Sequence, residues 1–168
     1  NKNLEIVIIF LLILLNGIFS MSEMALISAR KNRLEIAAKK GSSSARAALD
    51  LANEPNNFLS TVQIGITHIG ILTGIFSGDK VTTDVQVFLE QFEVLKPYAN
   101  SLSVGVVVVL LTFFSLILGE LLPKRIGLNY PEAIAKAIAM PMNIISKVAT
   151  PFVWLLTKST DFILNILN

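Results

Sequence analysis

The chain has 168 residues and a formal net charge of +2, and 53% of its residues are hydrophobic, with a mean hydropathy of +0.67. This composition is too apolar for an ordinary soluble domain and indicates a membrane protein. The small net charge gives no indication of nucleic-acid binding, and the absence of cysteine excludes disulfide bonds and thiolate metal sites. The length suits a single domain, and a chain that begins with Asn1 rather than Met is expected to be a fragment or a processed product.

Three apolar stretches are long enough to cross a membrane, which requires roughly 20 mostly apolar residues. They cover about residues 4–27, 58–78 and 101–122. The polar segment between the first two is rich in alanine, so we expect it to form short helices that are interrupted near Gly41 and Ser42. The sequence therefore predicts an all-α membrane protein with three transmembrane helices and a short helix pair between the first two.

The distribution of charge predicts the orientation of these helices. Residues 30–57 carry six Lys and Arg residues against three acidic ones, whereas the loop after the second span is acidic. Because Lys and Arg concentrate in cytoplasmic loops, we expect the helix pair to be cytoplasmic. Three spans then place the N-terminus outside the plasma membrane and the C-terminus in the cytoplasm.

The last segment, about residues 131–165, is predicted to be helical and amphipathic. A Pro-Glu pair at its start is typical of a helix N-terminus. Lys136, Lys147 and Lys158 are spaced eleven residues apart, close to three helical turns, so they would mark one polar stripe on an otherwise apolar surface. Such juxtamembrane helices lie in the membrane interface rather than across the membrane.

Two prolines, Pro141 and Pro151, are expected to divide this juxtamembrane segment into separate helices. The alternative is a fourth membrane span over about residues 140–156. This alternative is less favourable because Lys147 would then lie in the middle of the membrane, where a lone charge is costly.

Small oxygen-bearing side chains recur inside the first two spans. Asn16 and Ser20 are four residues apart and share a helix face, and Ser22 lies on the neighbouring face. Gln63 and Thr67 repeat this spacing in the second span. Polar groups in membrane spans usually face a bundle interior or a water-filled cavity, so these side chains are candidate ligands of an ion. Alternatively, Asn16 bridges two helices through a hydrogen bond.

The third span ends in GELLPK, where Glu120 directly follows a residue whose backbone carbonyl is expected to lack its usual hydrogen bond. Pro123 has no N–H, so the carbonyl of Gly119 loses its helical partner, and we expect the helix to break at the proline. Lipid tolerates neither a free carbonyl nor a carboxylate unless it is satisfied. A hard cation such as Mg²⁺ or Na⁺ would satisfy both, because such ions take oxygen ligands. Alternatively, Glu120 pairs with Lys124 one turn later.

Gly70, Gly74 and Gly78 form two overlapping G-x-x-x-G spacings in the second span. Small residues at this spacing let helix backbones approach closely. This face and the third span are candidates for the contact surface of a dimer.

Three stretches, LLNGIFSMSEMALISARKNRLE, NFLSTVQIGITHIGIL and GELLPKRIGLNYPE, resemble the membrane domain shared by CorC-type bacterial proteins and animal CNNM proteins. The resemblance covers nearly the whole of residues 1–168 as one transmembrane domain. It implies three transmembrane helices, a pair of short cytoplasmic helices, a juxtamembrane helical region and a homodimer. In this family a paired CBS nucleotide-binding module usually follows the membrane domain, and that cytoplasmic partner is absent from this chain.

The function that the resemblance implies is export of Mg²⁺, driven by entry of Na⁺, with the ion held by side chains of all three spans and a backbone carbonyl. By motif, Glu120 is the strongest ligand assignment and Ser20 the next. Many relatives carry Asn directly after, or two residues after, the glycine of the second-span motif, where this chain has Ile66 and Thr67. Thr67 or Gln63 could substitute for that asparagine.

Two other functions are alternatives to transport. A Mg²⁺-sensing membrane anchor for cytoplasmic CBS domains, without transport, would use the same ligands. An intramembrane enzyme is disfavoured because the spans contain no pair of aspartates, no H-E-x-x-H and no G-x-S-x-G. We therefore expect a transport protein and not an enzyme.

Overall fold

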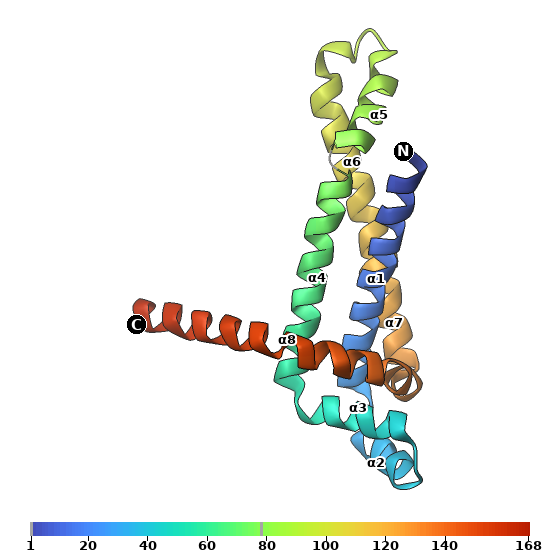
Figure 1. Cartoon of the computed structure of the whole chain (residues 1–168). Helices are drawn as coiled ribbons and strands as arrows, with labels where there is room; N and C mark the ends of the chain where they lie inside the picture. The colour runs from blue at the N-terminus through green and yellow to red at the C-terminus, as the bar shows by residue number, and fades with distance from the viewer. Residues whose placement is uncertain (1, 78) are drawn as a thin grey trace. The chain divides into compact units, whose positions relative to one another are not determined.

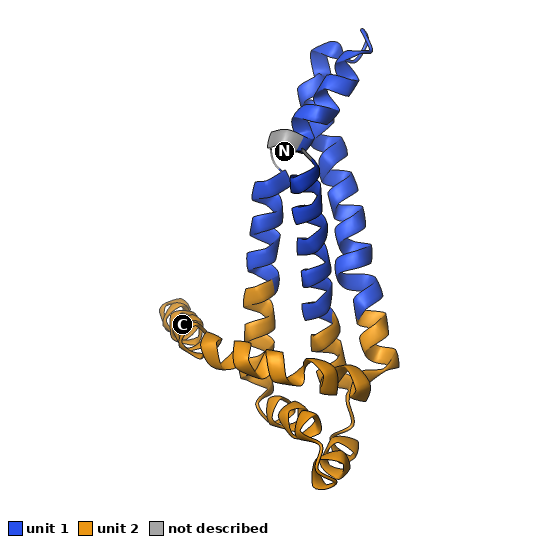
Figure 2. Ribbon diagram, turned by 45° about the vertical axis from the view of Figure 1, so that its right-hand side comes forward, with its two compact units in different colours: residues 1–20, 66–123 blue, residues 21–65, 124–168 orange. Residues whose placement is uncertain are grey.

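The computed structural model describes residues 2–77 and 79–168, which contain helices and no strand (Figure 1). The elements in chain order are α1 (Lys2–Ser28), α2 (Lys31–Lys39), α3 (Ser43–Asn53), α4 (Pro55–Ser77), α5 (Asp79–Glu90), the 3₁₀ turn η1 (Lys96–Tyr98), α6 (Ala99–Leu116), the π-helical turn η2 (Ile117–Leu121), α7 (Leu122–Asn129) and α8 (Pro131–Leu167). They form two compact units: unit 1 contains residues 1–20 and 66–123, and unit 2 contains residues 21–65 and 124–168 (Figure 2).

Four helical stretches are long and apolar enough to cross a membrane, namely Asn3–Ser28, Pro55–Ser77, Lys96–Asn129 and Pro131–Leu167. Along α6, large apolar side chains such as those of Val108, Val109 and Phe113 are exposed, as expected for a helix that faces lipid. The prediction of an all-α, multi-pass membrane protein is therefore confirmed. Because α8 also qualifies by length and composition, the count of three spans stays a prediction.

The helical segment of the third predicted span continues past Pro123. In η2 the Leu122 N–H donates to the Ile117 carbonyl five residues earlier, and α7 then extends to Asn129. A π-helical turn is wider than an α-helical turn, so it accommodates a residue that lacks an N–H without ending the helix. The prediction that the helix breaks at Pro123 is therefore wrong.

The helix pair predicted after the first span is present in unit 2 as α2 and α3. Between them, Gly41 has a φ of +100°, in the left-handed region that favours glycine. Ser42 caps α3, because its hydroxyl accepts a hydrogen bond from the Ala45 N–H at 3.1 Å. The predicted interruption near Gly41 and Ser42 is confirmed, and the cytoplasmic location of the pair stays a prediction.

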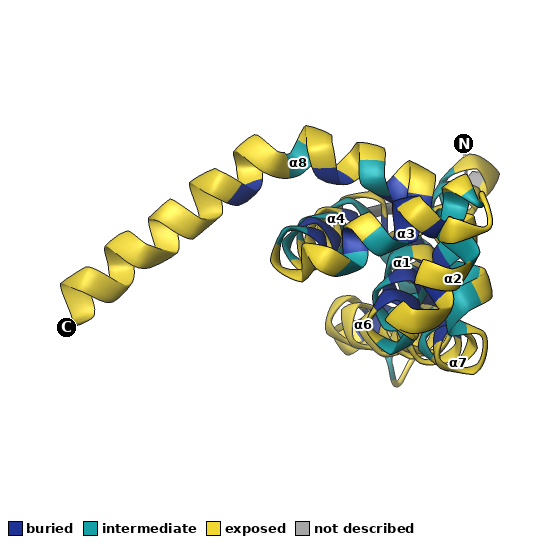
Figure 3. Ribbon diagram, turned by 90° about the horizontal axis from the view of Figure 1, so that it is seen from below, coloured by how far each residue is buried: buried dark blue, intermediate teal, exposed yellow. Residues whose placement is uncertain are grey.

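In unit 2, α3 packs against α8 (Figure 3). Ala45 and Ala48 of α3 and Ala135 and Ala139 of α8 are completely buried. Small side chains let two helices approach closely, as they do between membrane helices. The alanines of the polar segment therefore contribute to tertiary packing as well as to helix formation.

α8 is one continuous helix of 37 residues, although Pro141 and Pro151 lie inside it. The prediction that these prolines divide the segment is therefore wrong. Each proline removes a helical hydrogen bond, at a cost of about 3 kcal/mol, and leaves the carbonyl of Ala137 or Lys147 without its helical donor. All four residues are exposed, so water or lipid headgroups can satisfy these carbonyls and the helix persists.

Within unit 2, α8 runs crosswise to the parts of α1 and α4 that belong to the same unit (Figure 1 and Figure 2). The first half of α8 carries all of its buried residues but one, whereas every residue from 154 to 168 is exposed (Figure 3). Trp154 and Phe162 are among the apolar side chains of this exposed half.

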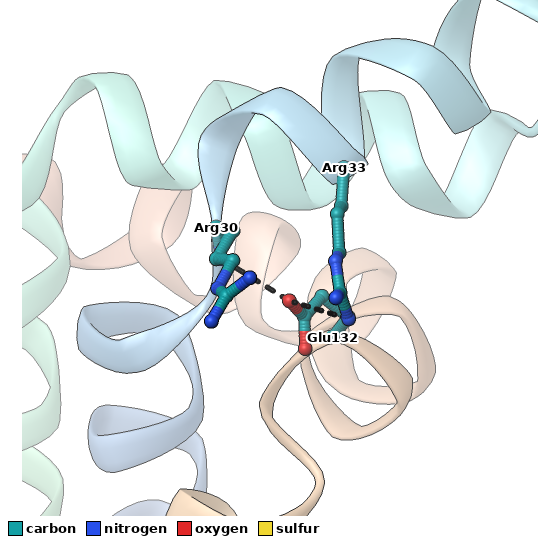
Figure 4. A network of polar contacts seen from close by, with 3 residues as sticks. All are labelled: Arg30, Arg33 and Glu132. Carbon is teal, nitrogen blue, oxygen red and sulfur yellow. Dashed lines mark hydrogen bonds and ion pairs between the residues drawn. The ribbon is translucent and has the colours of Figure 1, made fainter.

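Glu132, at the start of α8, receives two contacts from the junction between α1 and α2 (Figure 4). The Arg30 backbone N–H donates to Glu132 Oε1 at 3.5 Å, and Arg33 Nη1 lies 3.8 Å from the same oxygen. The Arg33 side chain is 64% exposed and that of Glu132 is 20% exposed, so solvent weakens the pair. These contacts fix the start of α8 beside the end of α1.

Candidate functional site

In unit 1, the face of α1 that carries Asn16 and Ser20 packs tightly against η2. Gly17 makes this contact: a Cβ atom at this position would lie 2.9 Å from the Leu118 carbonyl oxygen and 2.9 Å from the Pro123 ring. A side chain does not fit at such distances without displacing its neighbours. Glycine therefore allows α1 and η2 to touch through their backbones.

The Gly119 carbonyl in η2 has the altered hydrogen bonding that the sequence predicts. Pro123, four residues later, has no N–H to donate. The Asn16 side chain supplies a donor instead, because its Nδ2 lies 3.1 Å from the Gly119 carbonyl oxygen. The alternative in which Asn16 bridges two helices is therefore confirmed, and its partner is the Gly119 carbonyl.

Two further oxygen-bearing side chains accompany this hydrogen bond. Glu120 follows Gly119 in η2 and is partly exposed, and its carboxylate forms no hydrogen bond or ion pair with the described residues. Ser20, one turn after Asn16, is completely buried, and within the described part of the chain its hydroxyl has no hydrogen-bond partner. A buried hydroxyl without a partner is unfavourable, so Ser20 has an unused capacity to bind a ligand.

A cavity of about 140 Å³ opens beside Asn16 in unit 1. Its other lining residues are Ile13, Ile69, Gly70, Thr73 and Ser115. Ser115 of the third span and Thr73 of the second are oxygen-bearing residues that are not among the predicted ligands. The spacing of Gln63 and Thr67 continues to residues 70, 71 and 74, so it does not include Thr73. The Thr73 hydroxyl donates to the Ile69 carbonyl at 2.8 Å, which leaves its oxygen available as an acceptor.

Three of the predicted ligands lie outside this cluster of groups. Thr67 belongs to unit 1, but it is exposed and does not line the cavity beside Asn16. Gln63 and Ser22 belong to unit 2, where Gln63 is exposed and Ser22 is buried. All three residues have interactions of their own. Four of the seven predicted ligands thus lie on α1 and η2 in unit 1, where a hydrogen bond joins Asn16 to Gly119. We call these four residues the η2 cluster: Asn16, Ser20, Gly119 and Glu120.

Gly70 and Gly74 of the second span do not mediate close packing with the described residues. A Cβ atom at Gly70 or Gly74 would meet no other atom within 4 Å, and Gly78 lies outside the described residues. In unit 2, by contrast, a Cβ atom at Gly127 would lie 2.7 Å from the Met21 carbonyl oxygen. The face of α4 that carries Gly70 and Gly74 is therefore open.

The residues that the structure describes contain no group of three or more His, Asp and Glu side chains that could hold a metal ion. A cation at the η2 cluster would have the Glu120 carboxylate as its charged ligand. Its other protein ligands would be neutral oxygens, which are the kind that Mg²⁺ and Na⁺ accept and that softer transition metals disfavour.

Comparison with known proteins gives a match over almost the whole chain. The family model described as CNNM, the Cyclin M transmembrane N-terminal domain, matches residues 6–168. The UPF0053 protein sll0260 of Synechocystis sp. (strain ATCC 27184 / PCC 6803 / Kazusa) is 51% identical over 163 residues, which are 97% of this chain and 36% of that protein.

Two further relatives are more distant. The Polyamine export protein of Escherichia coli (strain K12) is 34% identical over 162 residues, which are 96% of this chain and 36% of that protein. The UPF0053 protein YhdP of Bacillus subtilis (strain 168) is 27% identical over 155 residues, which are 92% of this chain and 35% of that protein. The chain thus spans about a third of the length of these curated relatives.

Proposed function

Because this chain belongs to the family of CNNM transmembrane domains, we propose that it is the membrane domain of a cation transporter that exports Mg²⁺ in exchange for Na⁺. One observation carries the proposal: the Asn16 side-chain amide, which can turn away, donates to the Gly119 carbonyl in the π-helical turn that precedes Pro123. The Glu120 carboxylate follows directly in η2.

The hydrogen bond between Asn16 and Gly119 suggests how the site opens. Rotation of the Asn16 amide would replace its Nδ2 by its Oδ1 and release the Gly119 carbonyl at the same time. Two oxygens would then become available for a cation together, beside Glu120 and the unpartnered hydroxyl of Ser20. In the cation-free state the amide satisfies the carbonyl, as the apolar surroundings require.

The η2 cluster has one carboxylate, and this low charge favours weak binding, so that a bound ion can leave. One carboxylate neutralises Na⁺ fully but Mg²⁺ only by half, and Mg²⁺ commonly keeps several waters beside one or two carboxylates. Conduction requires an ion to bind well enough to enter and weakly enough to leave. We therefore expect modest affinity and competition between the two ions, and an exchanger needs both.

The proposed topology has three spans, with the N-terminus outside and the C-terminus in the cytoplasm of the plasma membrane. Unit 1 carries three Lys and Arg residues against six Asp and Glu residues, whereas unit 2 carries eleven against six. This asymmetry supports a cytoplasmic position for unit 2. The crosswise course of α8 and its apolar, Lys-bearing second half support a position in the membrane interface.

The proposed assembly is a homodimer whose full-length chain continues into a cytoplasmic CBS pair. Gly70 and Gly74 are exposed and leave space around their Cβ positions, which supports a contact with a second copy through small residues. The relatives, of which this chain covers about a third, leave room for further domains.

A second candidate substrate is an organic polycation, because a relative with 34% identity is named Polyamine export protein. The same cluster acting as a Mg²⁺ sensor for cytoplasmic domains, without transport, is the alternative to transport itself. We propose no catalytic role.

Binding and flux separate these possibilities. The first measurement is thermal unfolding of the detergent-purified chain with Mg²⁺, Ca²⁺, Na⁺ or a polyamine. A ligand at 100 times its Kd raises the free energy of unfolding by about 2.7 kcal/mol. We expect Mg²⁺ to stabilise the wild type, and we expect Glu120→Gln and Ser20→Ala to abolish or weaken the response. Glu93→Gln, an exposed carboxylate of unit 1, is the matched control and should respond as the wild type does.

Proteoliposomes then test transport. Mg²⁺ efflux that requires an opposing Na⁺ gradient and is lost in Glu120→Gln would support the proposal. Binding without flux under any Na⁺ gradient would favour the sensor, and polyamine flux without Mg²⁺ flux would favour the second substrate. An unchanged Mg²⁺ response in Glu120→Gln would show that the η2 cluster is not the site.

A further inference from the structure

Unit 2 contains two cavities that share a wall formed by Leu51 and Phe58. The first, of about 320 Å³, has Asp50 and Glu54 in its lining, and we call it the acidic cavity. The second, of about 280 Å³, has neither carboxylate, and we call it the apolar cavity. Both are separate from the η2 cluster, which belongs to unit 1, and the proposed transport gives the apolar cavity no role.

The lining of the apolar cavity is almost entirely hydrocarbon. Eight of its nine lining residues have apolar side chains, and Lys31 is the ninth. Leu26, Leu51 and Phe58 form its buried part. Such a cavity offers water no hydrogen-bond partners, so it stays dry and binds hydrocarbons instead. Its volume is near the lower limit of roughly 300–1,000 Å³ for small-molecule pockets, which suits one segment of an alkyl chain.

The apolar cavity lies at one end of two apolar helices, next to α2 and α3 in the lower part of Figure 1. Leu26 and Ile27 belong to the last turn of α1, and Phe58 and Leu59 belong to the first turns of α4. Both helices are long and apolar enough to cross a membrane. Ile27 is 58% exposed and Leu59 is 36% exposed, as expected for side chains that face lipid. Acyl chains of the membrane can therefore reach the cavity without passing through water.

The charged groups near the apolar cavity are mainly basic. Lys31 is exposed and forms no ion pair with residues 2–77 or 79–168. It is the first residue of α2, a helix that has no side-chain cap from Arg30 and no acidic residue in its first turn. Arg30 and Arg33 add two positive charges, of which Glu132 offsets one. A helix N-terminus with basic side chains attracts an anionic group such as a phosphate.

We propose that the apolar cavity binds one anionic phospholipid. Part of an acyl chain fills the space beside Leu26, Leu51 and Phe58, and the headgroup phosphate lies at Lys31 and the N-terminus of α2. A free phosphate would leave the hydrocarbon wall unused. A zwitterionic lipid would bring a second, positive group to a basic rim. The site is independent of the cation that the η2 cluster carries.

Native mass spectrometry of the detergent-purified chain tests the headgroup contact, because it counts bound lipids and gives the affinity of each. We expect the first dioleoylphosphatidylglycerol to bind about fivefold more tightly than dioleoylphosphatidylcholine, the effect of one Lys or Arg near an anionic headgroup. Lys31→Gln should abolish this preference. Lys40→Gln, which removes the same charge at an exposed position at the other end of α2, is the matched control and should retain it. Equal loss in both variants would indicate diffuse attraction and overturn the site.

Ala52→Leu tests the acyl contact separately from folding. The larger side chain fills part of the apolar cavity, so the Tm of the lipid-free chain should stay the same or rise. The affinity for both lipids should fall several-fold, because the acyl chain loses its space. Unchanged binding of both lipids in Ala52→Leu would overturn the acyl site. Displacement of dioleoylphosphatidylglycerol from the wild type by inorganic phosphate would assign Lys31 to a free anion and overturn the lipid as the occupant.

Discussion

Unit 1 and unit 2 both contain a carbonyl four residues before a proline, and its surroundings differ between the units. In unit 1 the buried Gly119 carbonyl accepts a hydrogen bond from Asn16 at 3.1 Å. In unit 2 the carbonyls released by Pro141 and Pro151 belong to exposed residues of α8. Where water or headgroups are within reach, a lost donor needs no replacement, whereas inside an apolar span the protein must supply one.

Each unit also contains one buried hydroxyl without a partner in the described part of the chain, Ser20 in unit 1 and Ser146 in unit 2. Carboxylates accompany both, Glu120 in the η2 cluster and Asp50 and Glu54 around the acidic cavity. Folding alone gains nothing from an unpaired hydroxyl.

The largest expected effect comes from adding a methyl group at a glycine where two helix backbones touch. Gly17→Ala in unit 1 and Gly127→Ala in unit 2 place a methyl group 2.9 Å and 2.7 Å from backbone oxygens, respectively. Overpacking of this kind costs about 1–3 kcal/mol, so both variants should have a lower Tm in detergent. Gly70→Ala has open space and is the control, and it should be neutral or stabilise the helix by about 1 kcal/mol. A Tm of Gly17→Ala equal to that of Gly70→Ala would contradict the close approach.

A double-mutant cycle sharpens the comparison of the released carbonyls. Asn16→Ala should destabilise the chain by about 1–3 kcal/mol, because the Gly119 carbonyl then has no donor. Pro123→Ala restores a backbone N–H, so Asn16→Ala should cost much less when Pro123→Ala is also present. Denaturant or thermal unfolding of the four variants measures this coupling. Additive effects of the two substitutions would mean that Asn16 does not compensate for the proline.

The smallest expected effect concerns the exposed ion pair of unit 2. Glu132→Gln loses the contact with Arg33 at 3.8 Å and weakens the acceptor for the Arg30 N–H. Pairs with this exposure contribute about 0–1 kcal/mol, and salt screens them. The Tm difference from the wild type should be small at low salt and vanish near 1 M salt, where the Debye length is about 3 Å. A large loss of stability that persists in salt would show that Glu132 acts as a buried anchor.

The sequence alone determined much of this protein. The length and apolarity of the helical stretches identify the membrane helices. Gly41 and Ser42 identify the interruption between α2 and α3. Both can be read from the sequence because each depends only on neighbouring residues. The sequence also marks Gly119 as the residue whose carbonyl Pro123 cannot serve with an α-helical hydrogen bond.

Tertiary structure decided how these local signals were resolved. It replaced the expected break at Pro123 by the turn η2, because Gly17 allows α1 to approach closely and Asn16 supplies the missing donor. It kept α8 continuous through two prolines, and it placed Asp50 of α3, Glu54 of the α3–α4 junction and Ser146 of α8 around one cavity. Such contacts depend on which faces meet in space, and periodicity along the chain does not contain that information.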